Sequence, residues 1–334
     1  MKTIFSNVIF GGASLIKVSI CVITYNQQEY IEQCLKGIAK QNVDFDIEVI
    51  IFDDCSTDRT WEIIQRFANE YSFFKCYQHE ENVGMMENLT SALFKCSGEF
   101  IALCEGDDFW VDTNKLCEQV RFSNDNGNFG MLIHPAHEAD ADSNVLDILF
   151  NKGSVHTSFY LNDILSQAGQ FSPTASYFFP RKVLDELPQW FNTATVGDLF
   201  LEIYSTKVGP IVYMPKPYAC YRTNSINSWS FHARKFDYRK NLNRSKNLEL
   251  DLRRCSEDFP DNKNLFNRKI AESLSAQAES YLMLNEFGCY RSAIDESIRL
   301  CKLFTRTQVI MNMLRHFPRL LKLIIHFKHR LLSR

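Results

Sequence analysis

Residues 100–110 read FIALCEGDDFW, a short apolar run that leads into a glycine flanked by acidic residues. The run from Phe100 to Cys104 is typical of a buried strand in a parallel sheet. The adjacent aspartates Asp107 and Asp108 repel each other unless a cation or a hydrogen-bond donor compensates their charge. Proteins hold Mg²⁺ and Mn²⁺ with one or two carboxylates together with substrate phosphates. The stretch therefore predicts a strand that ends at a divalent-cation site, and a surface turn is the alternative for the pair taken alone.

The chain before this stretch alternates apolar runs with helical patterns. Buried strands are expected at Val18–Thr24, at Ile47–Phe52 and at Phe73–Gln78, and a helix is expected after each of them. This alternation predicts an α/β fold with a mostly parallel sheet and helices on both faces. Ligands of such sheets bind beyond the carboxyl ends of the strands, where Asp53 and Asp54 follow the second strand. The alternative for this pair is a turn or a helix N-cap.

The chain after residue 130 is less regular, with short strands expected at 131–135, 211–214 and 218–221. A solvated acidic loop is predicted in place of a metal cluster for the polar residues between the first two of these, because their spacing is irregular: His134, His137, Glu138, Asp140 and Asp142. From about residue 237 the pattern is helical only. We therefore expect an N-terminal leader at 1–16, a catalytic domain at 17–235 and a helical region at 236–334.

Composition excludes several classes of protein. The net charge of -3 over 334 residues gives no reason to expect a nucleic-acid partner. The 11 cysteines include no C-x-x-C pair, which favours free thiols in a reducing cytoplasm over disulfides or a zinc site. The sequence contains no run of 18 apolar residues, so no transmembrane helix is expected. The first strand lacks the G-x-G-x-x-G of a dinucleotide-binding oxidoreductase, and no G-x-x-x-x-G-K-[ST] motif is present.

Taken together, the polar motifs resemble those of family 2 glycosyltransferases, which have the GT-A fold. The resemblance covers about residues 17–232, and the shared order and spacing of the motifs make it specific. The motifs in this sequence are Thr24-Tyr25-Asn26, the segment Asp53-Asp54-Cys55-Ser56-Thr57-Asp58, Asn82-x-Gly84 with Asn88, Glu105-Gly106-Asp107-Asp108-Phe109-Trp110, Thr174-Ala175-Ser176, Gly197-Asp198, and Tyr221-Arg222 with Ser228-Trp229-Ser230.

The resemblance implies a role for each of these positions. Thr24 and Asp54 would contact the nucleobase of a nucleotide-sugar donor, with UDP as the expected nucleotide, and Tyr25, Asn26 and Asp53 would lie close by. Asp107 would face the ribose or the metal, and Asp108 would bind Mg²⁺ or Mn²⁺. Asp198 would be the general base of an inverting transfer, and its alternative role is an N-cap for the helix that follows.

Two positions depart from the pattern of the resembling subgroup. Gly197 stands where the family usually has an acidic residue before the base, and Asn224 stands where the subgroup often has a histidine. The resemblance therefore does not identify the third metal ligand, and His232 is a candidate to replace the missing histidine. Arg222 suits the diphosphate because a guanidinium matches phosphate oxygens, and its alternative is a structural ion pair.

The C-terminal tail is basic, since residues 297–334 carry nine lysines or arginines and no acidic residue. From residue 314 its pattern is amphipathic, with an expected apolar face of Leu314, Phe317, Leu321, Ile324 and Ile325. Such a helix can lie on an anionic membrane surface, or it can pack on the rest of the chain. We expect a cytoplasmic enzyme at the inner face of the membrane with a glycan or lipid-linked acceptor, as in bacterial surface-polysaccharide assembly. A non-catalytic scaffold that binds nucleotide sugars is the alternative outside enzymes.

Overall fold

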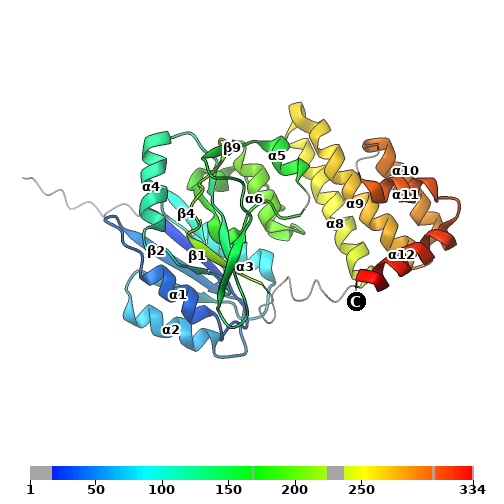
Figure 1. The fold of residues 1–334 in the computed structure, drawn as a ribbon. Helices are drawn as coiled ribbons and strands as arrows, with labels where there is room; N and C mark the ends of the chain where they lie inside the picture. The colour runs from blue at the N-terminus through cyan, green and yellow to red at the C-terminus, as the bar shows by residue number, and fades with distance from the viewer. Residues whose placement is uncertain (1–16, 168, 224–236, 303–304, 333–334) are drawn as a thin grey trace, which may run out of the picture.

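A mixed eight-stranded sheet forms the centre of the first part of the molecule (Figure 1). The computed structural model describes residues 17–167, 169–223, 237–302 and 305–332. The strand order of this sheet is β3-β2-β1-β4-β10-β6-β11-β9. The first four of these strands are parallel, which confirms the predicted half of the sheet. β10 is antiparallel to both of its neighbours, and β9 is antiparallel at the far edge. The strands are β1 (Val18–Thr24), β2 (Ile47–Asp53), β3 (Phe74–Gln78), β4 (Phe100–Leu103), β6 (Met131–Ile133), β9 (Thr157–Phe159), β10 (Phe178–Pro180) and β11 (Ile211–Tyr213).

Helices cover both faces of this sheet because successive strand residues point to opposite sides. Val18, Ile20 and Val22 of β1 join one apolar core, whereas Cys21 and Ile23 join the other. The first core also takes side chains from α1, α2 and α4, and the second takes side chains from α3, α5 and α6. These helices are α1 (Ile31–Ala39), α2 (Thr60–Glu70), α3 (Met85–Lys95), α4 (Lys115–Asn126), α5 (Leu161–Ser166) and α6 (Gly197–Ser205), with 3₁₀ turns η1 (Thr174–Ser176), η2 (Arg181–Glu186) and η3 (Phe191–Thr193) between the last two.

A second, four-stranded sheet corrects the prediction of a solvated loop after residue 134. Its strand order is β5 (Phe109–Trp110), β12 (Ala219–Arg222), β7 (Ala136–Ala139) and β8 (Val145–Leu149). His134 is fully buried, with its ring edge-on to Tyr218. Asp140 accepts backbone hydrogen bonds from Asp142 and Asn144 in the β7–β8 turn. The polar residues therefore build a hairpin, which their sequence pattern alone did not reveal.

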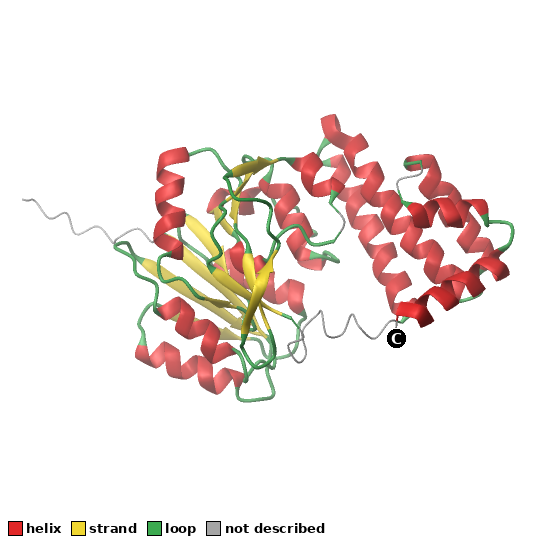
Figure 2. Ribbon diagram, viewed as in Figure 1, coloured by secondary structure: helices red, strands yellow, loops and turns green. Residues whose placement is uncertain are grey.

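The remainder of the described chain is helical and lies to one side of the sheets (Figures 1 and 2). It comprises α8 (Tyr238–Glu257), η4 (Pro260–Asn262), α9 (Lys263–Met283), α10 (Phe287–Leu300), α11 (Arg306–Met313) and α12 (Pro318–Leu332). Apolar residues of α8 and α9 belong to the same core as α6, so this region packs directly on the catalytic domain. The predicted leader at 1–16 and the predicted boundary at 235 lie outside the described residues. All 11 cysteines are free thiols, as expected.

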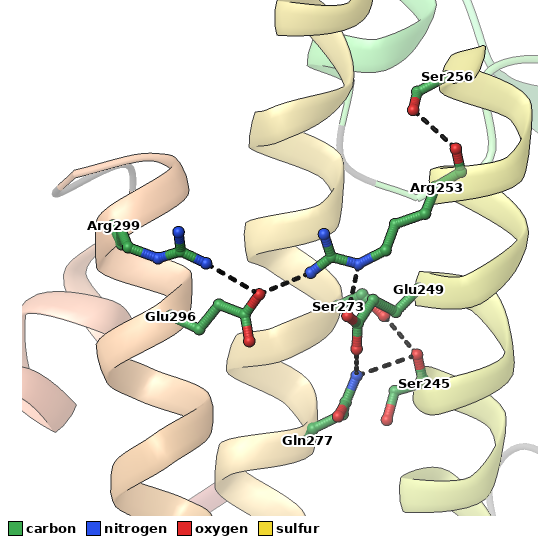
Figure 3. Close-up of polar contacts among 8 residues, drawn as sticks. All are labelled: Ser245, Glu249, Arg253, Ser256, Ser273, Gln277, Glu296 and Arg299. Atoms are coloured by element: carbon green, nitrogen blue, oxygen red, sulfur yellow. Dashed lines mark hydrogen bonds and ion pairs between the residues drawn. The ribbon is translucent and has the colours of Figure 1, made fainter. Parts of the chain in front are cut away.

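A polar network joins α8, α9 and α10 (Figure 3). Glu249 accepts hydrogen bonds from Arg253 at 2.8 Å and from Gln277 at 2.6 Å. Arg253 also donates to Glu296 on α10 at 2.8 Å, and Ser273 donates to the carbonyl oxygen of Ser245 at 2.6 Å. Because it links three helices, this network restricts their sliding along one another.

The tail does not present the apolar face that the sequence suggested. Leu321 is fully buried against α9 and α10, and Leu314 and Ile325 pack around the same cluster. Phe317 and Ile324 instead point away from it and are 64% and 45% exposed. Packing on the chain's own helices therefore accounts for only part of the predicted face. Within the described residues, no helix is long and apolar enough to cross a membrane.

Candidate active site

The carboxyl ends of β1, β2 and β4 converge on one edge of the large sheet. The backbone N–H of Asp54 donates to the carbonyl oxygen of Thr24, and that of Gly106 donates to the carbonyl oxygen of Ile23, both at 3.0 Å. A Cβ on Gly106 would lie 2.8 Å from Oγ1 of Thr24. The close approach of the loops that follow β1 and β4 therefore requires a glycine at this position.

The first two motifs build this edge by bonding to each other. Asn26, held at a positive φ of 50°, accepts hydrogen bonds from the backbone N–H and hydroxyl of Thr57 through its side-chain oxygen. The hydroxyl of Thr24 donates to Gln27, and Tyr25 beside it is 39% exposed. Asp53 is fully buried and accepts hydrogen bonds from Ser56 and Gln78. Burial raises the pKa of Asp53, and these hydrogen bonds oppose that shift.

Asp54 holds the loop before α3. Its two carboxylate oxygens accept backbone hydrogen bonds from Val83 at 2.7 Å and from Gly84 at 3.0 Å. Gly84 has a φ of 89°, a conformation that favours glycine, so the N-x-G motif supplies a turn that fits this carboxylate. The structure thus assigns Thr24, Asn26, Asp53 and Asp54 to loop architecture, and their contact with a nucleobase stays a prediction.

Asp108 lies at the end of β4 in a setting that suits a cation. It is 2% exposed, and Oδ1 accepts a 2.8 Å hydrogen bond from the backbone N–H of Arg222. Oδ2 is buried and has no hydrogen-bond partner among the described residues. Burial, with the charges of Asp107 and Glu105 next in effect, raises the pKa of Asp108 well above its usual range. A divalent cation would compensate the negative charge of Asp108 and would give Oδ2 a ligand partner.

The protein itself supplies few ligands to such a cation. Among the described residues no group of three or more histidine, cysteine, aspartate or glutamate side chains could hold a metal ion. One or two carboxylates are nonetheless the usual protein contribution to a Mg²⁺ or Mn²⁺ site completed by phosphates and water. Asp108 fits this pattern, with Asp107 adjacent to it in the chain. Asn224 and His232 lie outside the described residues.

Arg222 has a structural role in this fold, and its contact with a diphosphate stays a prediction. Its side chain is buried, and its three nitrogens donate to protein oxygens. Their acceptors are the carbonyl oxygens of Asp107 and Asp140 at 2.8 Å and the side chains of Ser143 and Gln33 at 3.0 and 2.7 Å. The guanidinium therefore links the loop that contains Asp107 and Asp108 to α1 and to the β7–β8 turn.

Asp198 lies in the first turn of α6 and lines a cavity of about 550 Å³. Glu105, Tyr177 and Tyr221 from the catalytic domain also line this cavity, as do Arg244 and Lys269 from the helical region. Oδ1 of Asp198 accepts the backbone N–H of Leu199 at 2.8 Å. Burial raises the pKa of Asp198, and this hydrogen bond and the positive charge of Arg244 oppose the shift. A partly buried carboxylate with a raised pKa at a cavity wall is suited to accept a proton.

The cavity also contains acidic groups that the sequence did not single out as functional. Burial, with the charges of Asp107 and Asp198, raises the pKa of Glu105 to about 8. Glu202, four residues after Asp198 on the same face of α6, accepts a hydrogen bond from Tyr177. Burial also raises the pKa of Glu202 well above its usual range. The i,i+4 spacing of Asp198 and Glu202 was the signal available in the sequence.

Sequence comparison finds a match to the family model described as "Glycosyl transferase family 2" over residues 19–187. An uncharacterised protein of Mycobacterium tuberculosis is 33% identical over 225 residues, which cover 67% of this chain and 63% of that protein. The poly(ribitol-phosphate) beta-N-acetylglucosaminyltransferase TarS of Staphylococcus aureus is 33% identical over 123 residues, 36% of this chain and 21% of TarS. The match thus spans under two thirds of the length of these relatives.

Structural comparison finds the same fold in solved structures. Residues 1–349 of S. aureus TarS in complex with UDP-GlcNAc superpose with a TM-score of 0.62 at 19% identity, covering 92% of this chain and 88% of that one. A mannosyltransferase of Pyrobaculum calidifontis, in complex with GDP-Man and Mn²⁺, has a TM-score of 0.51 at 17% identity, covering 90% and 79%. The likeness to TarS extends over most of the chain, so it includes part of the helical region as well as the sheet.

Proposed function

Because the chain belongs to glycosyl transferase family 2, we propose that it is an inverting glycosyltransferase that moves a sugar from a nucleotide diphosphate donor to an acceptor hydroxyl. The observation that carries the proposal is the pairing of two carboxylates with different environments. Asp108 has a buried oxygen without a partner among the described residues, and Asp198 lines a cavity large enough for a sugar and part of an acceptor. The first suits a cation, and the second suits a proton.

In the proposed reaction the acceptor hydroxyl lies in the cavity with its proton directed at the Asp198 carboxylate. The acceptor oxygen attacks C1 of the sugar as Asp198 takes the proton, and the nucleoside diphosphate leaves from the opposite face with the bonding electron pair. The new glycosidic bond therefore has inverted configuration and no covalent sugar–enzyme intermediate forms. General base assistance of this kind is worth about 10²–10⁴-fold in rate.

Asp108, with Asp107, would hold the Mg²⁺ or Mn²⁺ ion against the donor diphosphate. When bound, the ion neutralises charge that develops on the leaving group. Arg222 contributes by fixing the backbone of Asp107 and the carboxylate of Asp108. Its side chain donates to the carbonyl oxygen of Asp107, and its backbone N–H donates to Oδ1 of Asp108. The loop of Thr24, Tyr25, Asn26, Asp53 and Asp54 would receive the nucleobase at the neighbouring strand ends.

UDP is the proposed nucleotide, and the structural likeness to a UDP-GlcNAc complex of TarS supports an N-acetylhexosaminyl or hexosyl group as the transferred sugar. The acceptor is proposed to be a glycan or a lipid-linked glycan of bacterial surface-polysaccharide assembly. Two matching relatives support a polymer or glycan acceptor: TarS is a poly(ribitol-phosphate) beta-N-acetylglucosaminyltransferase, and an abequosyltransferase of Salmonella typhimurium is 34% identical over 93 residues. We propose a cytoplasmic enzyme working at the inner face of the membrane.

Contact with that membrane is proposed for the exposed face of α12. Large apolar side chains lie there at helical spacing, namely Leu320, Leu323 and Ile324, and Phe317 directly precedes the helix; each is 45–64% exposed. Arg319 and Lys322 belong to the same helix, and the tail carries no acidic residue. Apolar residues beside basic ones are the composition of helices that lie in the interface of anionic bilayers.

Thermal unfolding with UDP, GDP, dTDP and NAD, each with and without Mn²⁺, tests the proposed donor class. A ligand at about 100 times its Kd adds about 2.7 kcal/mol to the folded state. We expect a Mn²⁺-dependent rise in Tm with UDP and release of UDP from a UDP-sugar. A rise without any product would leave a nucleotide-binding scaffold, and a rise with NAD alone would contradict the proposal.

A further inference from the structure

Three ionisable residues, two in α8 and one at its C-cap, lie seven positions apart, and all three act on the catalytic domain. Arg244, Asp251 and Asp258 share one face of the helix, because seven residues make almost two full turns. Asp258 accepts a hydrogen bond from the hydroxyl of Tyr204 near the end of α6. This face of α8 is therefore the side on which the helical region meets α6, the helix that carries Asp198.

Asp251 fixes the chain just before the proposed base. Its Oδ2 atom accepts the backbone N–H of Thr195 at 2.9 Å and the hydroxyl of the same residue at 2.7 Å. Asp251 is only 5% exposed, so this pair of hydrogen bonds is shielded from water. Thr195 precedes Asp198 by three residues and lines the same cavity. The position of Asp198 consequently depends on α8 as well as on its own helix.

Arg244 lies two turns before Asp251 and lines the cavity together with Asp198. The charge of Asp198 also acts on four acidic groups, namely Glu105, Glu202, Tyr177 and Tyr221. Lys269 and Glu272 of α9 line the same cavity, and the charge of Lys269 acts on Glu202. Among the described residues, Arg244 is the cation whose charge acts on Asp198, and it opposes the effect of burial. An uncompensated carboxylate in such surroundings would bind a proton in place of serving as a base.

We propose that Arg244 is a positioning residue for the transfer reaction, holding the Asp198 carboxylate ionised and directed into the cavity, so that the helical region completes the catalytic centre. The proposal rests on the proposed role of Asp198 as the base. Arg244 contacts no reacting atom in the proposed reaction, and its charge affects the reaction through Asp198. The network of α8 with α9 and α10 supports this role, because it holds the helix backbone in place (Figure 3).

A double-mutant cycle tests the electrostatic coupling of Arg244 and Asp198 without any assay of activity. Urea unfolding at pH 7 is measured for wild type, Arg244→Gln, Asp198→Asn and the double variant. We expect Arg244→Gln to lower the folding equilibrium constant about ten-fold more when Asp198 is present than when it is Asn. Arg239→Gln, an exposed change in the first turn of the same helix, should give the same effect in both backgrounds. Equal effects of Arg244→Gln in both backgrounds would overturn the proposal.

The pH profile of UDP release from the UDP-sugar, measured at saturating Mn²⁺ without acceptor, tests the functional part. Removing the positive charge should move the acid limb about one unit toward higher pH, because the base then protonates more readily. At pH values below the acid limb, the activity of Arg244→Gln should therefore be about ten-fold lower than that of wild type, and at pH values above it the two activities should be equal. Arg244→Lys should keep the acid limb of wild type. An unchanged limb in Arg244→Gln would refute the inference, whereas absence of UDP release from wild type would refute the proposed function itself.

Discussion

The backbone N–H of Arg222 donates a 2.8 Å hydrogen bond to Oδ1 of Asp108, so the two oxygens of this carboxylate have different environments. One oxygen is committed to strand β12, and the other is buried without a partner among the described residues. A buried acceptor left unsatisfied costs about 1–3 kcal/mol, and a charged one costs more. The structure therefore carries an energetic deficit at Asp108 that a bound cation would remove.

Asp108→Asn tests this deficit. The amide keeps an oxygen for the Arg222 N–H and removes the buried charge, so the metal-free variant should be at least as stable as wild type at pH 7. Because the pKa of Asp108 is raised in the folded state, wild-type stability should fall as pH rises above the ordinary aspartate range, and the variant should lack this fall. Urea unfolding between pH 4 and pH 8 measures both effects.

The same variant should lose the rise in Tm that Mn²⁺ and UDP give together. Asp125→Asn, an exposed change on α4, is the matched control and should keep that rise. A full Mn²⁺-dependent rise in Asp108→Asn would exclude this carboxylate as a metal ligand.

Asp198→Asn should retain the donor-induced rise in Tm and lose about 10²–10⁴-fold in transfer, because the amide cannot take the proton of the acceptor. Sugar transfer is measured by UDP release, and donor binding is measured by thermal unfolding of the same preparation. Asp185→Asn changes an exposed carboxylate of η2 and should leave both unchanged. Transfer at the wild-type rate by Asp198→Asn would remove this residue from the mechanism.

Much of the catalytic domain follows from its sequence, because β1, β2 and β4 are largely apolar runs that suit a parallel sheet covered on both faces. In the small sheet, β12 was predicted, but the β7–β8 hairpin was missed, because its turn around Asp140 carries polar residues that look like a solvated loop. The structural contacts of Arg222 were also not predicted. A sequence identifies a cation but does not say which carbonyl oxygens surround it in the fold.

The contribution of α8 to the cavity was also beyond the sequence. Arg244 and Asp198 are 46 residues apart, and their proximity depends on the packing of α8 against α6 in a shared apolar core. Helix α12 gives a milder example. Its amphipathic period was correct, but the side that faces the bundle is set by where Leu321 fits between α9 and α10.

Leu321 and Leu323 should respond differently to the same truncation. Leu321→Ala removes a fully buried side chain and should destabilise the fold by about 2–5 kcal/mol, whereas Leu323→Ala should change stability by about 0.5 kcal/mol or less. Chemical denaturation of the full chain measures the two. Equal losses would mean that α12 is packed on both faces.

The exposed face of α12 should bind vesicles that contain phosphatidylglycerol. The double variant Phe317→Ser with Leu323→Ser should float with such vesicles less than wild type while keeping its Tm, because both side chains are more than half exposed. Pure phosphatidylcholine vesicles are the control for charge. Unchanged flotation of the double variant would argue against membrane contact, and a loss of dimer on gel filtration would identify a second copy of the chain as the partner of this face.

Glu48 gives a prediction of stability that is independent of function. This residue is 2% exposed on β2 and accepts hydrogen bonds from Ser19 at 2.6 Å, from the N–H and hydroxyl of Ser97 at 2.7 Å and from Lys75 at 2.6 Å. Burial alone would raise its pKa, but these donors together lower it to about 2. A folded-state pKa below the ordinary value means that the charged form stabilises the fold at neutral pH.

We therefore expect Glu48→Gln to destabilise the fold at pH 7 by about 2 kcal/mol, a figure reduced for the solvent exposure of Lys75. The stabilisation is complete above about pH 4.5 and is lost as pH falls toward the folded-state pKa of about 2. The difference between wild type and variant should accordingly shrink over that range in urea unfolding. Glu99→Gln, which alters an exposed pair with Lys17, should change stability by less than about 1 kcal/mol at either pH. A difference for Glu48→Gln that stays constant down to pH 3 would show that shape and packing, and not the charge of this carboxylate, hold the three segments together.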